Sequence, residues 1–388
     1  MRAYLDHAST TPMVPGAVEA MMPYLTGGAG NPSGAHDESR QARRAVDEAR
    51  EQLASSLAVG PTDLVFTGGG TEADNLAIVG GWEAVAASDS WSGPGPPAMV
   101  CSAMEHHAVL NTCRALAHRT GARLTEVPTS KEGIVDLEAL GEACTSEVGL
   151  VSVMTVNNEV GTVQPIEHVA EVVRNGSPSA VLHTDAVQAV PWIDVRARTA
   201  PADLVAISAH KFGGPMGVGA LLVRHGVRLH PLVHGGGQER GRRSGTHNVA
   251  GIAGMAAALA EIDPVRPETV ERVAAQRDRL GDGLMATVTG LTETTARDQK
   301  VAGILHLLVA GIESEALVVV LDAAGVAASA GAACSSGAVE ASHVLRSMGL
   351  GRELAVAGIR LSLGSGTTDA DIDHVLSVVP GVVAQLRD

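Results

Sequence analysis

The sequence predicts an α/β fold in which a large, mainly parallel sheet is followed by a smaller α+β unit. From about residue 17 to residue 260, short runs that are apolar on both faces alternate with longer helix-period segments, as in a buried parallel sheet. Beyond the proline-flanked stretch 263–267 the pattern changes to charged helices around a single apolar run. We therefore expect a large domain over residues 16–262 and a small domain over residues 1–15 plus 263–388.

The expected strands of the large sheet are four to seven residues long, and most are separated by enough chain for a helical crossover. The short glycine-rich link at 213–219 instead predicts a hairpin-like return between the last two strands. The expected strands lie at residues 64–67, 98–102, 150–156, 180–185, 204–208 and 219–223. In the smaller unit we expect helices at 268–284, near 313–322 and from 369, and a strand at 304–309.

Charge and composition exclude several classes of protein. The 388 residues carry a formal charge of −15, which repels nucleic acid and anionic membranes, and seven aromatic residues are too few for base-stacking platforms. There is no strongly apolar run of eighteen residues and no apolar signal core at the N-terminus. The four cysteines form no CxxC pair, so Cys101 and Cys144 are expected to be buried structural thiols. We expect a cytoplasmic protein.

A glycine-rich turn follows the first strand of the large sheet. Thr67-Gly-Gly-Gly-Thr71 precedes an apolar helix pattern at 76–85, and free amides at such a position favour a phosphate. The lysine of a nucleotide P-loop is missing, however, and a simple turn with a capping box from Thr71 to Asp74 is an equal alternative. Glu72 and Asp74 would also repel an anion.

Two further strands of the expected sheet end in charged residues. Asp185 closes the strand 180–185, and Lys211 follows the strand 204–208, two residues ahead of Gly213-Gly214. A strand-end aspartate is commonly a helix N-cap, whereas a lysine at the mouth of an apolar strand is costly unless it is paired or covalently used. Together with the glycine-rich turn, the two residues supply what pyridoxal phosphate requires: a Schiff-base amine, a partner for the ring nitrogen and a phosphate anchor.

The sequence resembles the cysteine desulfurases of the NifS/IscS family, within the fold-type I pyridoxal phosphate enzymes. The matching stretches recur from residue 4 to residue 364 and cover nearly the whole chain. They are YLDHASTTP (4–12), GNPSGAH (30–36), FTGGGTEADNLA (66–77), EHHAVL (105–110), VNNEVG (156–161), HTDAVQ (183–188), SAHKFGGPMGVGAL (208–221), HGGGQERGRRSGTHN (234–248), SAGAACSSG (329–337) and IRLSLG (359–364).

The resemblance implies a role for each matching residue. Lys211 would hold pyridoxal phosphate as a Schiff base, Asp185 would pair with the ring nitrogen, and Gln188 would bond the phenolate oxygen. His106 would stack on the ring and help to move protons. The residues that would hold the phosphate are Gly70, Thr71, Ser208, His210 and, from the other subunit of a homodimer, Thr246. Those that would bind the substrate are Asn31, Asn158 and Arg360, with Asn158 also near the coenzyme.

Cys334 decides the expected reaction. It lies among small residues at 329–337, which predicts a mobile loop and an accessible thiol, although an incidental cysteine in such a loop is the alternative. The resemblance implies conversion of L-cysteine to L-alanine, with sulfur carried on Cys334 as a persulfide and passed to a protein acceptor in iron–sulfur cluster assembly or thiolation. Ala302-Gly303 departs from the family, in which Pro-Asn is frequent at this place.

Other functions stay open at this point. A selenocysteine lyase or another fold-type I enzyme is the nearest, and a transaminase would not need Cys334. A non-catalytic sulfur-transfer scaffold and a nicotinamide oxidoreductase are further alternatives, but the second lacks a proper GxGxxG. We expect no metal, since the adjacent His106 and His107 rarely point the same way. The arginines at 240, 242 and 243 fit a dimer-interface segment better than a nucleic-acid site.

Overall fold

The structure is a computed structural model that describes residues 1–27, 30–89, 91, 93, 95–331 and 341–388. Its main feature is a seven-stranded sheet of order β2-β8-β7-β6-β5-β3-β4. Only β8 runs against its two neighbours, and every other pair is parallel. The strands are β2 (Leu64–Thr67), β3 (Ala98–Ser102), β4 (Leu124–Val127), β5 (Val148–Ser152), β6 (Val181–Asp185), β7 (Leu204–Ser208) and β8 (Gly219–Val223). The predicted α/β fold and the hairpin-like return between β7 and β8 are confirmed.

Two expectations for this sheet were wrong in detail. The strand expected at 150–156 is β5, which ends at Ser152, because the chain then bends so that Val156 pairs with Val163. Residues 153–156 stay buried all the same, which explains their apolar pattern. Strand β4 was not predicted, since this edge strand is only partly buried and its sequence, LTEV, carries a charge.

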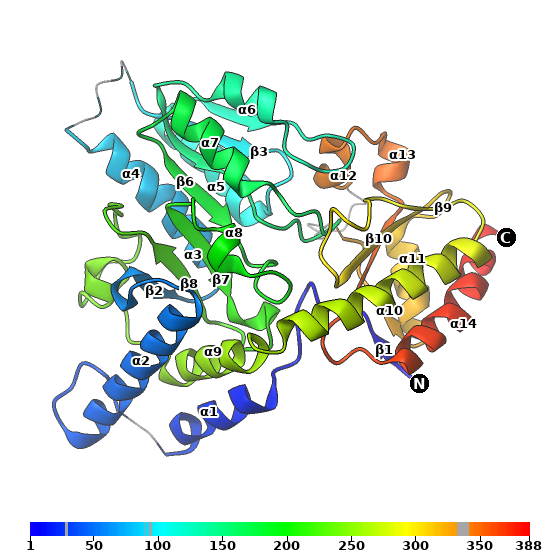
Figure 1. Ribbon diagram of the computed structural model, residues 1–388, viewed down its shortest axis with the longest axis horizontal. Helices are drawn as coiled ribbons and strands as arrows, with labels where there is room; N and C mark the ends of the chain where they lie inside the picture. Colours follow the sequence, from blue (N-terminus) through cyan, green and yellow to red (C-terminus); the bar gives the residue numbers. More distant parts are fainter. Residues whose placement is uncertain (28–29, 90, 92, 94, 332–340) are drawn as a thin grey trace.

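Helices cover the sheet on both faces (Figure 1). The helix after the glycine-rich turn begins at Gly70, earlier than the expected 76, and continues through a π-helical turn at Leu76–Gly80. The helices of this part are α1 (Pro15–Thr26), α2 (Asp37–Ser56), α3 (Gly70–Asn75), α4 (Gly81–Ala86), α5 (His107–Thr120), α6 (Leu137–Ala143), α7 (Ile166–Gly176), α8 (Val195–Arg198) and α9 (Val249–Ile262).

The second unit is built on a three-stranded antiparallel sheet, β12-β10-β9, and a parallel pair, β1-β11. Its strands are β1 (Ala3–Tyr4), β9 (Leu291–Glu293), β10 (Ile304–Val309), β11 (Val326–Ala327) and β12 (Gly358–Ser362). Its helices are α10 (Arg266–Thr287), α11 (Ser314–Ala323), α12 (His343–Ser347), α13 (Arg352–Ala355) and α14 (Asp369–Arg387). The expected helices and strand of this part are therefore present. The division into 1–15 plus 263–388 and 16–262 stays a prediction.

Both ends of the chain lie in this second unit, and α10 runs from α9 toward α14 (Figure 1). The first strand, β1, pairs with β11, and Asp6 bridges to Ser362, the last residue of β12. From there the chain runs to the carboxyl end of β7, where Thr11 donates its backbone N–H to the carbonyl of His210 at 2.9 Å. The N-terminal segment thus links the small sheet to the carboxyl edge of the large one.

The departure at Gly303 has a steric cause. A Cβ atom at this position would collide with the indole ring of Trp192, so the close packing of this tryptophan requires glycine. Cys101, Cys113 and Cys144 are buried free thiols, as expected for the first and third. In the part of the chain that the structure describes, no helix is both long and apolar enough to cross a membrane.

Candidate active site

A cavity of about 390 Å³ lies at the carboxyl ends of the parallel strands. Parallel strands present their carboxyl ends at one edge of the sheet, which is where open α/β sheets bind ligands. The cavity brings together ten of the residues expected from the sequence, drawn from five strand ends and from β12. These residues are Gly70, Thr71, His106, Asn158, Asp185, Gln188, Ser208, His210, Lys211 and Arg360.

The glycine-rich turn forms a cradle with open hydrogen-bonding capacity. Gly69 has φ +141°, which glycine alone adopts readily, and a Cβ atom on Gly70 would lie 2.8 Å from the side chain of Val187. The hydroxyl of Ser208 faces the same space and is buried without a hydrogen-bond partner among the described residues. Backbone amides at the start of a helix beside an unpartnered hydroxyl fit an anionic group such as a phosphate.

Glu72 does not repel an anion here, contrary to expectation. Arg243 donates to both of its carboxylate oxygens, at 2.6 and 3.1 Å, and the backbone N–H of Gly68 donates to it at 2.8 Å. Burial opposes ionisation, but the contacts with Arg243 and Gly68 lower the pKa of Glu72 below its usual value. The charge of Glu72 is therefore balanced locally.

Asp185 ends β6 with its side chain buried, at 5% exposure. Its Oδ1 accepts the backbone N–H of Val187 at 2.8 Å. Burial and then the neighbouring carboxyl of Asp74 raise the pKa of Asp185 to about 7. A carboxylate in such surroundings is stabilised by a cationic partner, so the position fits a protonated ring nitrogen.

Lys211 lies on the 3₁₀ turn Ala209–Lys211 that follows β7. Its Nζ donates to the carbonyls of Ala8 at 2.6 Å and Ser9 at 2.8 Å, and Gln188 Nε2 donates to the same Ala8 carbonyl at 2.7 Å. Burial, followed by repulsion from Arg360, lowers the pKa of Lys211 to about 8. Near neutral pH a useful fraction of this amine is therefore unprotonated and nucleophilic.

Arg360 reaches the cavity from the small sheet. It lies on β12 at 3% exposure, and its Nη1 donates to the carbonyl of Asn158 at 2.8 Å. Its Nη2 donates to Asp6 Oδ1 at 2.8 Å and to Ser9 Oγ at 2.7 Å, while the buried Nε has no partner among the described residues. A held guanidinium with spare donor capacity is suited to binding a carboxylate.

His106 caps α5 and presents its ring to the cavity. Its Nδ1 accepts the backbone N–H of Ala108 at 3.1 Å, which fixes the orientation of the imidazole. His106 is exposed to the open cavity, but desolvation by the cavity walls and then the nearby charge of Lys211 lower its pKa to about 4. The imidazole is therefore neutral at physiological pH, and its Nε2 can carry a proton.

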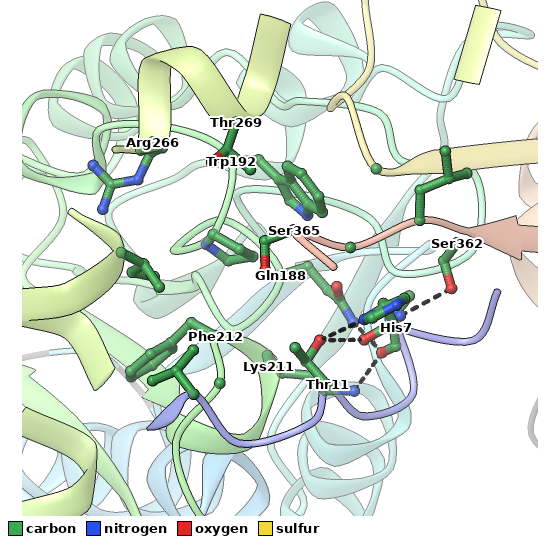
Figure 2. Close-up of a pocket in the computed structure, with 18 of the residues that line it drawn as sticks. His7, Thr11, Gln188, Trp192, Lys211, Phe212, Arg266, Thr269, Ser362 and Ser365 are labelled. Atoms are coloured by element: carbon green, nitrogen blue, oxygen red, sulfur yellow. Dashed lines mark hydrogen bonds between the residues drawn. The ribbon is translucent and has the colours of Figure 1, made fainter. Parts of the chain in front are cut away.

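A second, smaller cavity of about 190 Å³ lies next to the first and is mainly lined by apolar groups (Figure 2). Trp192 and Phe212 form part of its wall, and Thr11 Oγ1 donates to the carbonyl of His7 at 3.2 Å. Ala8, Gln188 and Lys211 line both cavities. Lys211 therefore lies in the wall between a polar and an apolar chamber.

Three expected site residues are not among those that line the larger cavity. Asn31 uses its side chain to accept the backbone N–H of Ser33 at 3.0 Å, and Thr246 lies in the loop between β8 and α9. Cys334 lies outside the described residues, so its expected position stays a prediction.

The cavity also contains residues that sequence reasoning missed. His107 and His343 approach each other at 3.3 Å between ring nitrogens, and Glu159 Oε2 accepts the hydroxyl of Ser342 at 2.6 Å. Asp74 lines the cavity as well. No sequence signal connected the segment at 342–343 with the others, whereas Asp74 stood in the glycine-rich motif and was interpreted as a possible cap and as a charge that would repel an anion.

The loop that carries Thr246 is anchored by a buried ion pair. Glu239 accepts from both Nη atoms of Arg50, at 2.6 and 3.1 Å, from the backbone N–H of Phe66 and from His247. Burial opposes ionisation, yet the hydrogen bonds from His247 and Arg50 lower the pKa of Glu239 to about 2. Glu239 and Arg240 both have positive φ, so this anchor holds a strained turn.

Replacing Glu239 with Gln is expected to destabilise the protein by about 3 kcal/mol at pH 7, because it leaves the Arg50 guanidinium buried without a counter-charge. The folded-state pKa lies below the usual 4.5, so this contribution is complete above pH 4.5 and is lost as the pH falls toward 2. Urea unfolding midpoints of the two proteins between pH 7 and pH 3 measure both effects. Glu126→Gln, which breaks the more exposed pair with Arg114, is the matched control and should change little. Equal midpoints for wild type and Glu239→Gln at pH 7 would contradict the prediction.

The fold is that of a recognised class of enzymes. Residues 3–375 match the family described as Aminotransferase class-V, and the chain belongs to this family. It is 43% identical over 390 residues to an IscS-like cysteine desulfurase of Mycobacterium tuberculosis, across 99% of this chain and 97% of the relative. A solved NifS-like protein superposes with a TM-score of 0.91 at 33% identity over all of both chains. Another solved structure, SspA in complex with cysteine, gives a TM-score of 0.80 at 30% identity and covers 94% of this chain and all of that one. The resemblance to the cysteine desulfurase family is thereby confirmed.

Proposed function

We propose that the protein is a pyridoxal phosphate-dependent cysteine desulfurase that converts L-cysteine to L-alanine and transfers the sulfur to Cys334 as a persulfide. One observation carries the proposal: an open anion cradle, a buried carboxyl and a lysine amine of lowered pKa face one cavity. Full-length similarity to cysteine desulfurases supports the choice of substrate.

The residues present fit the coenzyme. Its phosphate would be held by the helix start at Gly70 and Thr71 and by Ser208 and His210, with Thr246 supplied by the second subunit of a homodimer. Asp185 would pair with the ring nitrogen, Gln188 with the phenolate oxygen, and Asn158 and His106 would contact the ring. When bound, the coenzyme supplies an electron sink that stabilises negative charge at the substrate Cα.

The protein's own groups would place and deprotonate the substrate. Arg360, held by Asn158 and Asp6, would bind the substrate carboxylate through its guanidinium, with Asn31 also assigned to substrate binding. Lys211 is the base at Cα, since a pKa near 8 lets its Nζ accept a proton and return it near neutral pH. The neutral imidazole of His106 would hold a proton close to the reacting sulfur.

Sulfur transfer is assigned to Cys334. Its thiolate would attack the substrate sulfur, so that an S–S bond forms and the C–S bond breaks with its electrons left on carbon, where a proton completes L-alanine. An acceptor thiol, on a scaffold or carrier protein, then takes the sulfur. The SspA structure with cysteine supports this substrate. A cytoplasmic location stays an expectation from the sequence.

The test is to incubate the purified protein with L-cysteine and a reductant and to measure alanine and sulfide together. We expect equal amounts of both, and a loss of more than ~100-fold in Cys334→Ser because the attacking nucleophile is removed. Cys144→Ser, at a buried thiol away from the cavity, is the matched control and should keep its activity. Full alanine production by Cys334→Ser would overturn the assignment of the nucleophile and favour another enzyme of the same fold.

A further inference from the structure

Asp74 and His183 form a buried polar pair close to Asp185. Asp74 on α3 is 1% exposed and His183 on β6 is 0% exposed. Asp74 Oδ1 lies 3.5 Å from His183 Nε2, and both atoms are buried without a full hydrogen bond among the described residues. On the other side of the ring, His183 Nδ1 is 2.9 Å from the hydroxyl of Ser152. Buried polar atoms at this distance need a shared proton to be satisfied.

The pair adjoins the place assigned to the ring of the coenzyme. A carboxyl oxygen of Asp74, a carboxyl oxygen of Asp185 and a ring nitrogen of His106 all lie within 4.8 Å of one another. His183 and Asp185 are two residues apart on β6, so their side chains leave the strand on the same face. Asp74 is therefore close both to the cavity and to the side chain that would meet the ring nitrogen.

The surroundings of Asp74 and Asp185 decide which of them keeps a proton. Two carboxylates this close in a dry interior cannot both be ionised at low cost. Asp185 accepts a backbone N–H from Val187 and feels the positive charge of Lys211, and both favour its ionised form. Burial raises the pKa of Asp74 to about 8, with no favourable contact to offset it.

The other titratable groups facing Asp74 do not supply a positive charge. Burial lowers the pKa of His183 to about 4. Desolvation by the cavity walls and the charge of Lys211 lower that of the exposed His106 to about 4 as well, so both rings are neutral. Glu105 is fully buried as well, and burial raises the pKa of its carboxyl well above the usual value. Its Oε1 accepts the backbone N–H of Met154 at 2.7 Å. Asp185 is thus the carboxyl of this cluster that is best placed to carry a charge.

We propose that Asp74 is a positioning residue: it remains a neutral carboxylic acid that donates its proton to Nε2 of His183, and so keeps Asp185 as the one negative charge facing the ring nitrogen of the coenzyme. In this arrangement Nδ1–H of His183 donates to the hydroxyl of Ser152, which fixes the tautomer. The proposal rests on the proposed function for the identity of the coenzyme. The protonation of Asp74 itself does not depend on it.

Infrared difference spectroscopy of the coenzyme-free protein at pH 6 tests the protonation directly. The spectrum of wild type minus Asp74→Asn is expected to show the C=O stretch of one protonated carboxyl. The contributions of Glu105 and Asp185 cancel, because both carboxyls are present in the two proteins. Asp136→Asn, at an exposed N-cap that asparagine also serves, is the matched control and should show only an ionised carboxylate. A difference spectrum of Asp74→Asn with only carboxylate bands would overturn the proposal.

Titration with pyridoxal phosphate, followed by absorbance and fluorescence, tests the positioning role. Asp74→Asn mimics a neutral acid, so its Kd is expected within about threefold of wild type, with an unchanged pH midpoint of the coenzyme absorbance. Asp74→Ala removes the donor to His183 and should weaken binding by on the order of tenfold. Thermal melting checks that both variants fold. If Asp74→Ala does not fold, Asp74→Asn alone still tests whether Asp74 is neutral.

Two results of this titration would contradict the positioning role. A pH midpoint moved by about one unit or more in Asp74→Asn would show that a negative charge had been removed. A wild-type Kd in folded Asp74→Ala would show that Asp74 does not position the site. If wild type binds no pyridoxal phosphate, the proposed function fails instead, and the infrared result still reports the state of Asp74.

Discussion

Lys211→Ala is expected to bind pyridoxal phosphate only non-covalently and to lose at least ~10³-fold in the rate of alanine formation. The variant lacks both the amine that would join the coenzyme and the base at the substrate Cα, and removal of a base alone costs about 10²–10⁴-fold. The amine is prepared for both tasks by burial, which lowers its pKa to about 8. Absorbance spectra of the purified variant and rates with L-cysteine measure the two effects.

The chain offers an internal control for this prediction, because its lysines number only three: Lys131, Lys211 and Lys300. Borohydride reduction of wild type with bound pyridoxal phosphate, followed by peptide mass spectrometry, should place the adduct on Lys211. Lys300 is also buried but is bonded to Glu293, so it tests whether burial alone makes an amine reactive. An adduct on Lys131 or Lys300, or full activity of Lys211→Ala, would contradict the assignment.

Arg360→Lys is expected to lower kcat/KM for L-cysteine by about 100-fold, mainly through KM. Lysine keeps the charge but not the planar fork that binds two carboxylate oxygens at once, and a charge-assisted pair of this kind contributes about 3 kcal/mol. The guanidinium of Arg360 also donates hydrogen bonds to Asp6 and Ser9. Lysine has fewer donor groups, so it would hold these two residues of the cavity wall less firmly. Steady-state kinetics with L-cysteine measure the change.

Arg352→Lys is the matched control for Arg360→Lys. Arg352 is exposed at the start of α13, and its replacement should leave KM unchanged. Binding of pyridoxal phosphate should also be unchanged in Arg360→Lys, because the side chain is assigned to the substrate and not to the coenzyme. A variant with wild-type KM would show that another group binds the substrate carboxylate.

The placement of the cavity was predictable because it follows from strand direction. Asp185 and Lys211 are far from the glycine-rich turn in the sequence, but all three follow strands that run the same way, so they must meet at one edge. The hairpin-like return of β8 was predictable for a similar reason, since the ten residues between Ser208 and Gly219 are too few for a crossover.

Partial burial and long-range contacts were not predictable from local pattern. β4 is an edge strand with a charged residue, and its sequence alternation is too weak to distinguish it from a loop. His343 contacts His107 although more than two hundred residues separate them in the sequence, and the sequence around neither histidine predicts the contact. The collision of any side chain at Gly303 with Trp192 likewise becomes visible only when both are placed in space.

Protonation was also hidden from the sequence, because it depends on burial. Glu72 and Asp74 were both expected to repel an anion from the glycine-rich turn. The structure pairs Glu72 with Arg243 and buries Asp74 beside His183, so the contacts with Arg243 lower the pKa of the first carboxyl and burial raises that of the second. The sequence shows which side chains can ionise, whereas burial and neighbouring groups set the pKa of each one.

The carbonyl of Ala8 accepts hydrogen bonds from both Lys211 and Gln188, and the neighbouring Ser9 accepts from Lys211 and Arg360. The two ends of the chain are therefore not equivalent for protein engineering. A purification tag or a fluorophore fused ahead of Met1 sits eight residues from the backbone atom that orients the reactive amine, whereas one placed after Asp388 is separated from the cavity by the whole of α14. Affinity handles and surface attachment belong at the carboxyl end.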